Sequence, residues 1–159
     1  VNMRSPEFEP PNIPMAASAR AQGYPLLVAG QELEIGALSI GNPHAVLRVP
    51  DARQADVEQL GPLIETHSNF PQRVNAGFMQ IVADNKIQLR VYERGVGETL
   101  ACGTGACAAV VYGISRGWLR DSVTVALPGG KLSVSWAGEG HPVIMIGPTA
   151  VVFDGAIKI

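Results

Sequence analysis

Short alternating runs of hydrophobic and polar residues recur along most of the chain and predict β-strands rather than long helices. Turn residues separate neighbouring runs, and Gly30-Gln31, Asp84-Asn85 and Pro128-Gly129-Gly130 are expected to connect three pairs of strands. The predicted strands cover residues 24–29, 32–40, 45–49, 75–83, 87–94, 122–127, 131–136, 143–146 and 150–159. Residues 1–22 show no clear periodicity and are expected to form a strand stub followed by a loop.

Two segments place their hydrophobic residues at helical spacing. Residues 51–67 predict a helix that Pro62 splits, because proline removes an intrahelical donor and clashes with the preceding turn. Residues 104–117 are apolar on nearly every side, which predicts a buried helix that ends at Gly117. Helices do not alternate regularly with strands, which counts against a parallel doubly wound sheet. The sequence therefore predicts an α+β fold, with an antiparallel or mixed β-sheet wrapped around the helix at residues 104–117.

The composition of the 159 residues fits a globular domain and excludes several functions. A net charge of −2 offers no electrostatic footprint for nucleic acid or an anionic membrane surface. No hydrophobic run approaches the length that crosses a bilayer. Two cysteines do not make a disulfide scaffold, so a reducing cytoplasm is expected, and the scattered histidines and cysteines lack the spacing of a metal site. The chain begins at Val1 rather than Met, as a fragment or a processed chain would.

Cys102 lies in a glycine-rich turn at the start of the predicted buried helix. The first N–H groups of a helix lack internal partners, so they should lower the pKa of a thiol there. The N–H groups of Gly103 and Thr104 could also hold a carboxylate, next to which Cys102 could remove a proton. Such a turn can instead serve close packing alone, with an inert cysteine. Cys107 falls within the predicted buried helix, so it is expected to be a packed small hydrophobe. It is not expected to be a second base, because two bases that invert one carbon must approach it from opposite faces, whereas these two thiols leave the same turn of backbone.

Other polar residues around the predicted strands could take part in the same chemistry. Glu93 shares a strand face with three apolar residues, so its carboxylate should lie at the open end of the sheet or have a partner. Arg94 suits bidentate binding of a carboxylate, and His44 could tune a neighbouring thiol. Each residue can also be explained without a function. Glu93 could be a solvated residue at the end of a strand, Arg94 a solvated surface residue, and His44 the cap of a turn. His67 and His141 are expected to be structural.

Three motifs, taken in their order along the chain, strongly resemble the diaminopimelate epimerase family. They are Gly41-Asn42-Pro43-His44, Arg73-Val74-Asn75-Ala76-Gly77-Phe78 and the run from Glu93 to Cys107, and they are followed by Leu127-Pro128-Gly129-Gly130 and Gly140-His141-Pro142. The resemblance covers essentially the whole chain. It implies an enzyme of lysine and peptidoglycan precursor biosynthesis that interconverts LL- and meso-diaminopimelate without a cofactor or metal. Two cysteines on opposite faces of the α-carbon would move the proton.

The resemblance also implies a role for each candidate residue. Cys102 would be one of the two catalytic cysteines, with His44 and Glu93 setting its protonation. Gly103 and Thr104 would bind the reacting carboxylate through the start of the helix. The distal end of the substrate would be held by Asn42, Asn75 and Arg94, with Glu93 on an amine.

The family has two domains of this kind, and the chain resembles only the C-terminal one. An earlier Cys-Gly-Asn-Gly motif, which carries the partner cysteine, is missing, so the chain alone is expected to be inactive. Residues 1–148 would form the C-terminal domain, and residues 149–159 a strand that completes the missing N-terminal domain. Without that domain, the apolar strand Val151-Val152-Phe153 is prone to pair with another copy. The full enzyme is expected to be a homodimer, in which Phe153 takes the place of an aromatic contact residue, usually tyrosine.

Two alternatives remain open. A related proline or hydroxyproline racemase would share the two-thiol chemistry, but Asn42, Asn75 and Arg94 together favour a substrate with a distal amino-acid group. A non-catalytic, self-associating fragment is the alternative outside catalysis.

Overall fold

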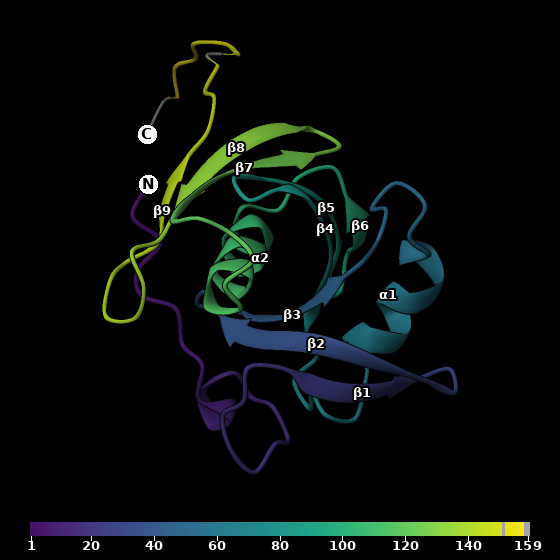
Figure 1. Cartoon of the computed structure of the whole chain (residues 1–159). Coiled ribbons are helices and arrows are strands. Elements are labelled where there is room, and N and C mark those ends of the chain that lie inside the picture. Colours follow the sequence, from purple (N-terminus) through teal and green to yellow (C-terminus); the bar gives the residue numbers. More distant parts are fainter. Residues whose placement is uncertain (151, 158–159) are drawn as a thin grey trace.

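Nine strands curl around a central helix in the computed structural model, which describes residues 1–150 and 152–157. The central helix is α2 (Gly103–Ser115), and a second helix, α1 (Val57–Glu65), lies outside the sheet (Figure 1). A short 3-10 helix covers Pro10–Asn12. The strands are β1 (Tyr24–Val28), β2 (Gln31–Ser39), β3 (Pro43–Arg48), β4 (Asn75–Ala83), β5 (Lys86–Glu93), β6 (Gly97–Thr99), β7 (Ser122–Leu127), β8 (Gly130–Ser135) and β9 (Ile144–Ile146). The α+β class and the mixed sheet around one helix are as the sequence predicts.

Two parallel strand pairs make the sheet mixed. The strand order is β1-β2-β3-β4-β5-β7-β8-β9, with β6 paired to β5. β3 and β4 are parallel and are connected through α1, while β5 and β7 are parallel and are connected through α2. Each connecting helix begins near the end of the first strand of its pair and leads the chain back to the start of the second strand. The start of α2 therefore lies near the end of β5, which fixes where the candidate site residues meet.

Helix α2 is buried because the sheet surrounds it. Every residue from Gly105 to Gly113 is buried, and the side chains pack against buried residues of β2, β3, β4, β5, β7 and β8. Gly36 of β2 allows the closest approach, since a Cβ atom there would lie 2.2 Å from the ring of Tyr112. The helix ends as predicted, with Gly117 at a φ of +69° just beyond it.

The opposite face of the sheet is covered by α1. Val57 and Ile64 of α1 pack in a second hydrophobic cluster with Ile35, Leu47 and Phe78 of the strands. β3 and the first half of β4 are consequently buried on both faces, which is why they read as continuous apolar runs.

The predicted helix over residues 51–67 is wrong in its extent and in its break. Residues 51–56 form turns, and the carbonyls of Ala52, Arg53 and Ala55 accept hydrogen bonds from the Arg90 guanidinium instead of from a helix. Pro62 lies inside α1 without splitting it. The residue before a proline normally avoids the helical region because its Cβ meets the proline ring, and Gly61 has no Cβ.

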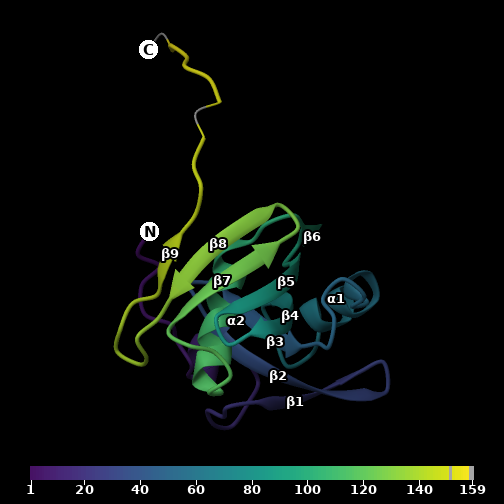
Figure 2. The same cartoon turned by 45° about the horizontal axis from the view of Figure 1, so that its top comes forward.

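Three further expectations differ from the structure. Residues 95–103, which no predicted strand or helix covers, contain strand β6, which pairs with the end of β5. The strand predicted over residues 45–49 begins two residues earlier, at Pro43, so His44 is part of β3. The strand predicted over residues 150–159 is not formed by residues 150 and 152–157, while residues 151, 158 and 159 lie outside the described residues. Figure 2 shows residues 152–157 extending away from the sheet.

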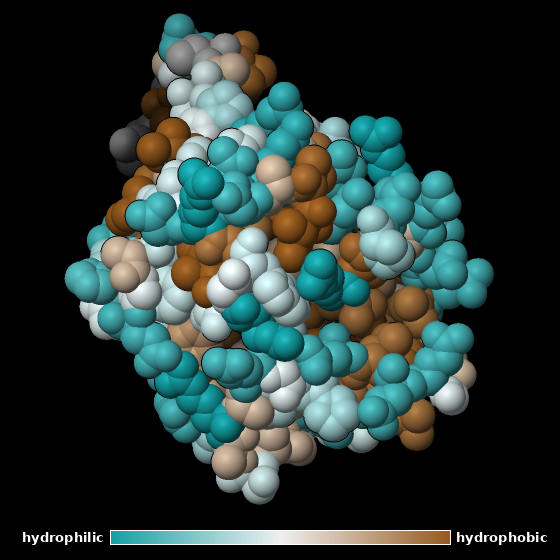
Figure 3. Space-filling view, viewed as in Figure 1, coloured by the Kyte–Doolittle hydropathy of each residue, from teal (hydrophilic) through white to brown (hydrophobic). Residues whose placement is uncertain are grey.

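Hydrophobic side chains of the C-terminal segment are exposed. Val152, Phe153 and Ile157 are 88%, 82% and 88% exposed, and hydrophobic surface is visible on the projecting segment in Figure 3. At the other terminus, the expected strand stub is reduced to two isolated bridges, one to β9 and one to β2. The Met3 N–H donates to Val143 O (2.8 Å) beside β9, and the Ser39 N–H of β2 donates to Glu7 O (2.9 Å).

Candidate active site

Four segments that carry predicted site residues meet at one edge of the sheet. β3 and β4 are parallel, so their first residues lie together, and His44 is the register partner of Asn75. β5 is antiparallel to β4, so Glu93 at its end reaches the same edge. Cys102 is the N-cap of α2, which starts where β5 and β6 end. The topology thus gathers residues that are up to 58 positions apart, from His44 to Cys102.

Cys102 is held tightly at the start of α2. Its backbone is extended, with φ −136° and ψ 106°, and the residue is only 5% exposed. The Sγ atom lies 3.7 Å from Thr104 Oγ1. A Cβ atom on Gly105 would lie 3.2 Å from this sulfur and 3.0 Å from Val91 Cγ2. The glycine-rich turn therefore gives the thiol its room.

Burial raises the pKa of the Cys102 thiol, which corrects the expectation that the helix start would lower it. Hydrogen bonds from the Gly105 N–H and with Thr104 do lower the pKa, but less than burial raises it. The negative charge of the nearby Glu93 raises the pKa further. In this chain Cys102 is consequently a protonated thiol at neutral pH.

Glu93 lies at the end of β5 with a partner, as its position in the sequence predicts. Ile87, Leu89 and Val91 on the same strand face are buried, and Glu93 itself is half-buried. Thr99 of β6 donates its hydroxyl hydrogen bond to the Glu93 carboxylate. The carboxylate is therefore oriented from the strand that leads into the Cys102 turn.

Asn75 connects three segments of the site. It is 3% exposed, its Nδ2 donates to Pro43 O (2.8 Å), and its Oδ1 accepts the Arg94 N–H (3.0 Å). The Arg94 side chain is exposed and donates from Nη1 to Gln72 O (3.1 Å). An amide has two donors and two acceptor lone pairs, so Asn75 keeps capacity for a ligand.

His44 is a buried neutral histidine. It is 1% exposed, and its Nε2 lies 3.0 Å from Asn42 Oδ1. Burial lowers the pKa of His44 to about 3, and the positive charge of Arg94 adds to this. A neutral ring suits hydrogen bonding within the site rather than charge pairing.

Sequence reasoning missed two residues that support this edge, Thr99 and Glu65. Thr99 lay in a segment for which no strand was predicted. Glu65 accepts hydrogen bonds from the Gly95 N–H (2.7 Å) and from Arg73 Nη1 (3.5 Å). A signal for Glu65 was present, because Val57, Gly61, Ile64 and Glu65 follow the i, i+4, i+7, i+8 spacing of one buried helix face.

Cys107 and His67 have the structural roles that the sequence predicts, whereas His141 is exposed and makes its contact through the backbone. Cys107 is fully buried, and burial raises the pKa of its thiol to about 12. His67 contacts Leu27 O through Nε2 (3.1 Å) and accepts the Asn69 N–H at Nδ1 (3.2 Å). The His141 carbonyl accepts the Trp136 Nε1–H (3.1 Å).

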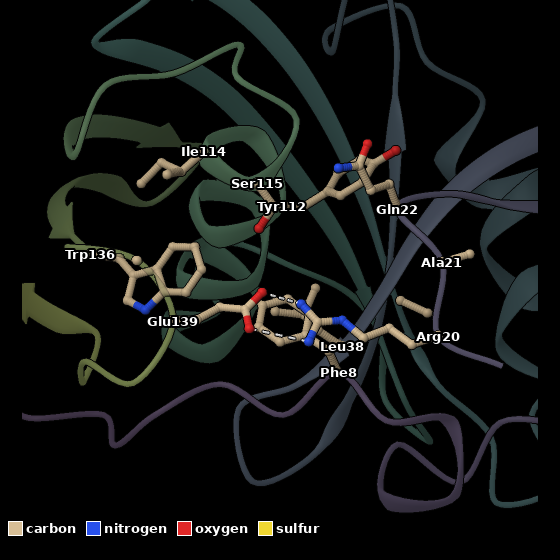
Figure 4. Close-up of a pocket in the computed structure, with 12 residues that line it drawn as sticks. Phe8, Arg20, Ala21, Gln22, Leu38, Tyr112, Ile114, Ser115, Trp136 and Glu139 are labelled. Atoms are coloured by element: carbon tan, nitrogen blue, oxygen red, sulfur yellow. Dashed lines mark hydrogen bonds and ion pairs between the residues drawn. The ribbon is translucent and has the colours of Figure 1, made fainter.

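A cavity of about 550 Å³ lies at the other end of α2, next to Tyr112, Ile114 and Ser115 (Figure 4). Phe8 and Trp136 line it, and so do Arg20 and Glu139, which contact each other directly as an ion pair. None of the residues that line it is a predicted site residue. The cavity and the candidate site residues therefore lie at opposite ends of α2.

Among residues 1–150 and 152–157, no cluster of His, Cys, Asp and Glu could hold a metal ion. Within the same residues, no helix is long and apolar enough to cross a membrane.

Comparison with known proteins supplies a family match over most of the chain. The family model described as diaminopimelate epimerase matches residues 36–152. Proteins named diaminopimelate epimerase from Alkalilimnicola ehrlichii and Pseudomonas entomophila are 60% and 56% identical over 159 residues. One from Thioalkalivibrio sulfidiphilus is 58% identical over 160 residues. The three matches cover 100% of this chain, but the chain spans only 57–58% of the relatives' own length.

Solved structures share the fold at low sequence identity. A hydroxyproline epimerase from Agrobacterium vitis superposes with a TM-score of 0.54 at 17% identity, covering 77% of this chain and 43% of that one. A probable proline racemase from Agrobacterium radiobacter K84 gives a TM-score of 0.54 at 19% identity, covering 83% and 50%. At this identity the likeness shows the fold alone.

Proposed function

The chain belongs to the diaminopimelate epimerase family, and from that premise we propose that the protein containing it interconverts LL- and meso-diaminopimelate. The observation that carries the proposal is the placement of Cys102 at the start of α2, at the edge where β3, β4 and β5 bring their polar residues. A buried thiol beside helix N–H groups suits proton transfer next to a bound carboxylate.

In the proposed reaction, one proton leaves the α-carbon and another is added from the opposite face. The N–H groups of Gly103 and Thr104, in the first turn of α2, would hold the α-carboxylate. Cys102 would donate its proton in one direction and, as thiolate, accept it in the other. The bond from carbon to one hydrogen breaks and the bond to the other forms, with no net change in oxidation state.

Cys107 does not fit the role of the second proton carrier. Its thiol is fully buried, with its pKa raised to about 12, and it follows Cys102 on the same helix. Cys102 and Cys107 are the two cysteines of the chain, so with Cys107 ruled out the chain supplies one reacting thiol. We therefore propose that the partner thiol comes from the part of the protein outside this chain, and that the chain alone is inactive.

The distal amino-acid end of the substrate would bind at Asn42, Asn75 and Arg94. Asn75 and Arg94 are joined by a hydrogen bond, and the exposed Arg94 guanidinium suits a carboxylate. Glu93 would accept a hydrogen bond from an amine. Together with the neutral His44, it would also set the protonation of Cys102.

The proposal extends to the assembly and location of the whole protein. Residues 149–159 would complete a second domain, and Phe153, which is 82% exposed here, would contact the partner in a homodimer. Both cysteines are free, as in a protein of the reducing cytoplasm, where we propose that it acts.

The test is to incubate the whole protein with LL-diaminopimelate in deuterated solvent. We expect the meso isomer to form with deuterium at one α-carbon, and no inversion of proline or hydroxyproline. Inversion of proline without turnover of diaminopimelate would instead identify a racemase of the same fold. No inversion of either would leave only a non-catalytic function.

A further inference from the structure

Three of the four buried polar residues in the described part of the chain lie at the site or beside it. They are His44, Asn75 and Glu65, and Ser39 is the fourth. Glu65 has no place in the proposed reaction. It is the last residue of α1, on the outer side of the sheet, and is 6% exposed. A buried carboxylate is costly unless it is hydrogen-bonded, so its partners show what it holds in place.

The partners of Glu65 are two segments that carry proposed substrate-binding residues. Its Oε1 accepts the Gly95 N–H at 2.7 Å, directly after Arg94, and lies 3.5 Å from Arg73 Nη1. Its backbone carbonyl accepts the Val74 N–H at 3.1 Å, directly before Asn75. One residue therefore fixes both the turn after β5 and the entry into β4.

The turn after β5 is held at two consecutive amides. The Arg94 N–H donates to Asn75 Oδ1 (3.0 Å), and the Gly95 N–H donates to Glu65. Gly95 has a φ of +76°, a left-handed conformation that glycine adopts readily and that a hydrogen bond can fix. The Gly95 N–H belongs to the peptide that follows Arg94, so the two hydrogen bonds hold the backbone on both sides of Arg94 and with it the direction of its side chain.

We propose that Glu65 is a positioning residue, whose carboxylate holds the turn after β5 so that Arg94 stays beside Asn75 in the arrangement that binds the distal end of the substrate. The inference rests on the proposed function, because it takes these two residues as the distal binding group. Glu65 acts from behind the site and does not touch the substrate. Loss of the carboxylate should therefore weaken substrate binding more than it slows proton transfer at Cys102.

The test uses the whole protein with a graded pair of substitutions and one control. Glu65→Gln keeps a neutral acceptor for the Gly95 N–H, whereas Glu65→Met keeps the length and helix preference of the side chain but accepts no hydrogen bond. The control is Glu34→Gln, which removes an exposed carboxylate paired to Arg116 (2.6 Å) away from the site. The measurements are KM, kcat and the hydrogen exchange rate of the Gly95 amide.

We expect KM for diaminopimelate to rise about tenfold in Glu65→Met and about threefold in Glu65→Gln, with kcat changed less than about threefold. Exchange of the Gly95 amide should accelerate in the same order, and Glu34→Gln should match the wild type in every measurement. A merely structural role for Glu65 would lower thermal stability without separating KM from kcat.

The inference is overturned if Glu65→Met leaves KM at the control value, or if kcat falls while KM is unchanged. Should Glu65→Met fail to fold, Glu65→Gln still decides, because unchanged KM and unchanged Gly95 exchange overturn the proposal. A wild-type protein that does not act on diaminopimelate refutes the proposed function instead. The exchange rate of Gly95 then shows separately whether Glu65 holds the turn.

Discussion

The two ends of helix α2 gather polar groups of different kinds. At its start, Cys102 lies at the same edge of the sheet as polar residues that are buried or half-buried and hydrogen-bonded at strand ends, such as Asn75 and Glu93. At its other end, the polar groups are ion pairs on the surface around an open cavity, such as Arg20 with Glu139. Buried polar groups need partners of fixed geometry, whereas exposed ion pairs contribute little. The start of α2, where the polar groups are held in fixed geometry, is therefore the better candidate for chemistry, although the large cavity lies at the other end.

The largest difference should appear between the two cysteines. We expect Cys102→Ala to lower kcat of the whole protein at least about a thousandfold, since it removes a proton carrier. Cys107→Ala should keep kcat within about threefold and lower the free energy of unfolding by about 1 kcal/mol, because it removes only a packed sulfur. Steady-state kinetics and urea unfolding measure both effects. Equal activity losses in the two variants would remove the distinction between the thiols.

The loss of stability at low pH should come mainly from His44 of β3, at the same edge of the sheet as the start of α2. The folded protein protonates this residue only near pH 3, whereas the unfolded chain does so near 6.5. Between these values the unfolded state binds more protons, so stability falls as pH falls. We expect this to cost the wild type about 3 kcal/mol between pH 7 and pH 4.

The matched variant for this effect is His44→Gln, compared with the wild type in urea unfolding at pH 7 and pH 4. On acidification the variant should lose about 3 kcal/mol less stability than the wild type, because it lacks the buried imidazole. An identical pH dependence in both proteins would mean that His44 is not buried as a neutral ring.

Two glycines of α2 separate activity from stability. Gly105→Ala and Gly113→Ala change helix propensity equally, but a Cβ at Gly105 would meet Cys102 Sγ at 3.2 Å, and one at Gly113 would meet Leu119 Cδ1 at 2.2 Å. We expect Gly105→Ala to lower kcat about tenfold by displacing the thiol. Gly113→Ala should lower the free energy of unfolding by about 1–3 kcal/mol through overpacking and leave kcat nearly unchanged. The reverse assignment would contradict the placement of the site.

The smallest effect should follow from breaking the ion pair in the cavity. Glu139→Gln removes a charge from an exposed pair with Arg20. We expect neither kcat nor the thermal midpoint to change measurably. A clear loss of activity in this variant would mean that the cavity end of α2 takes part in the reaction.

Local patterns predict the elements of this fold better than they predict its site. The all-round apolar run of α2 marks a helix inside a sheet, and Gly117 marks its end because the residue adopts a positive φ. The hairpin turn at Asp84-Asn85 lies where its residues predict it, whereas Gln31 and Gly130, predicted as turn residues, already belong to β2 and β8. The parallel pairing of β3 with β4 is a long-range contact, and only that contact places His44 beside Asn75.

The pKa of Cys102 shows where local reasoning ends. The sequence places the thiol at a helix start, which by itself lowers a thiol pKa. Its burial depends on β5 and on residues that pack beside Gly105, and this burial outweighs the helix. Pro62 likewise stays inside α1 because Gly61 precedes it and packs against the Tyr92 ring, a contact that periodicity does not show.

The most direct measurement is the alkylation of the two thiols by iodoacetamide across a pH range, mapped by mass spectrometry with and without diaminopimelate. In the whole protein we expect diaminopimelate to protect Cys102, while Cys107 stays unmodified throughout. In the isolated chain, the midpoint for Cys102 should lie above the ordinary thiol pKa of about 8.5. Modification of Cys107 at the same rate, or a Cys102 that is alkylated without loss of activity, would contradict the assignment of Cys102 as the reacting thiol.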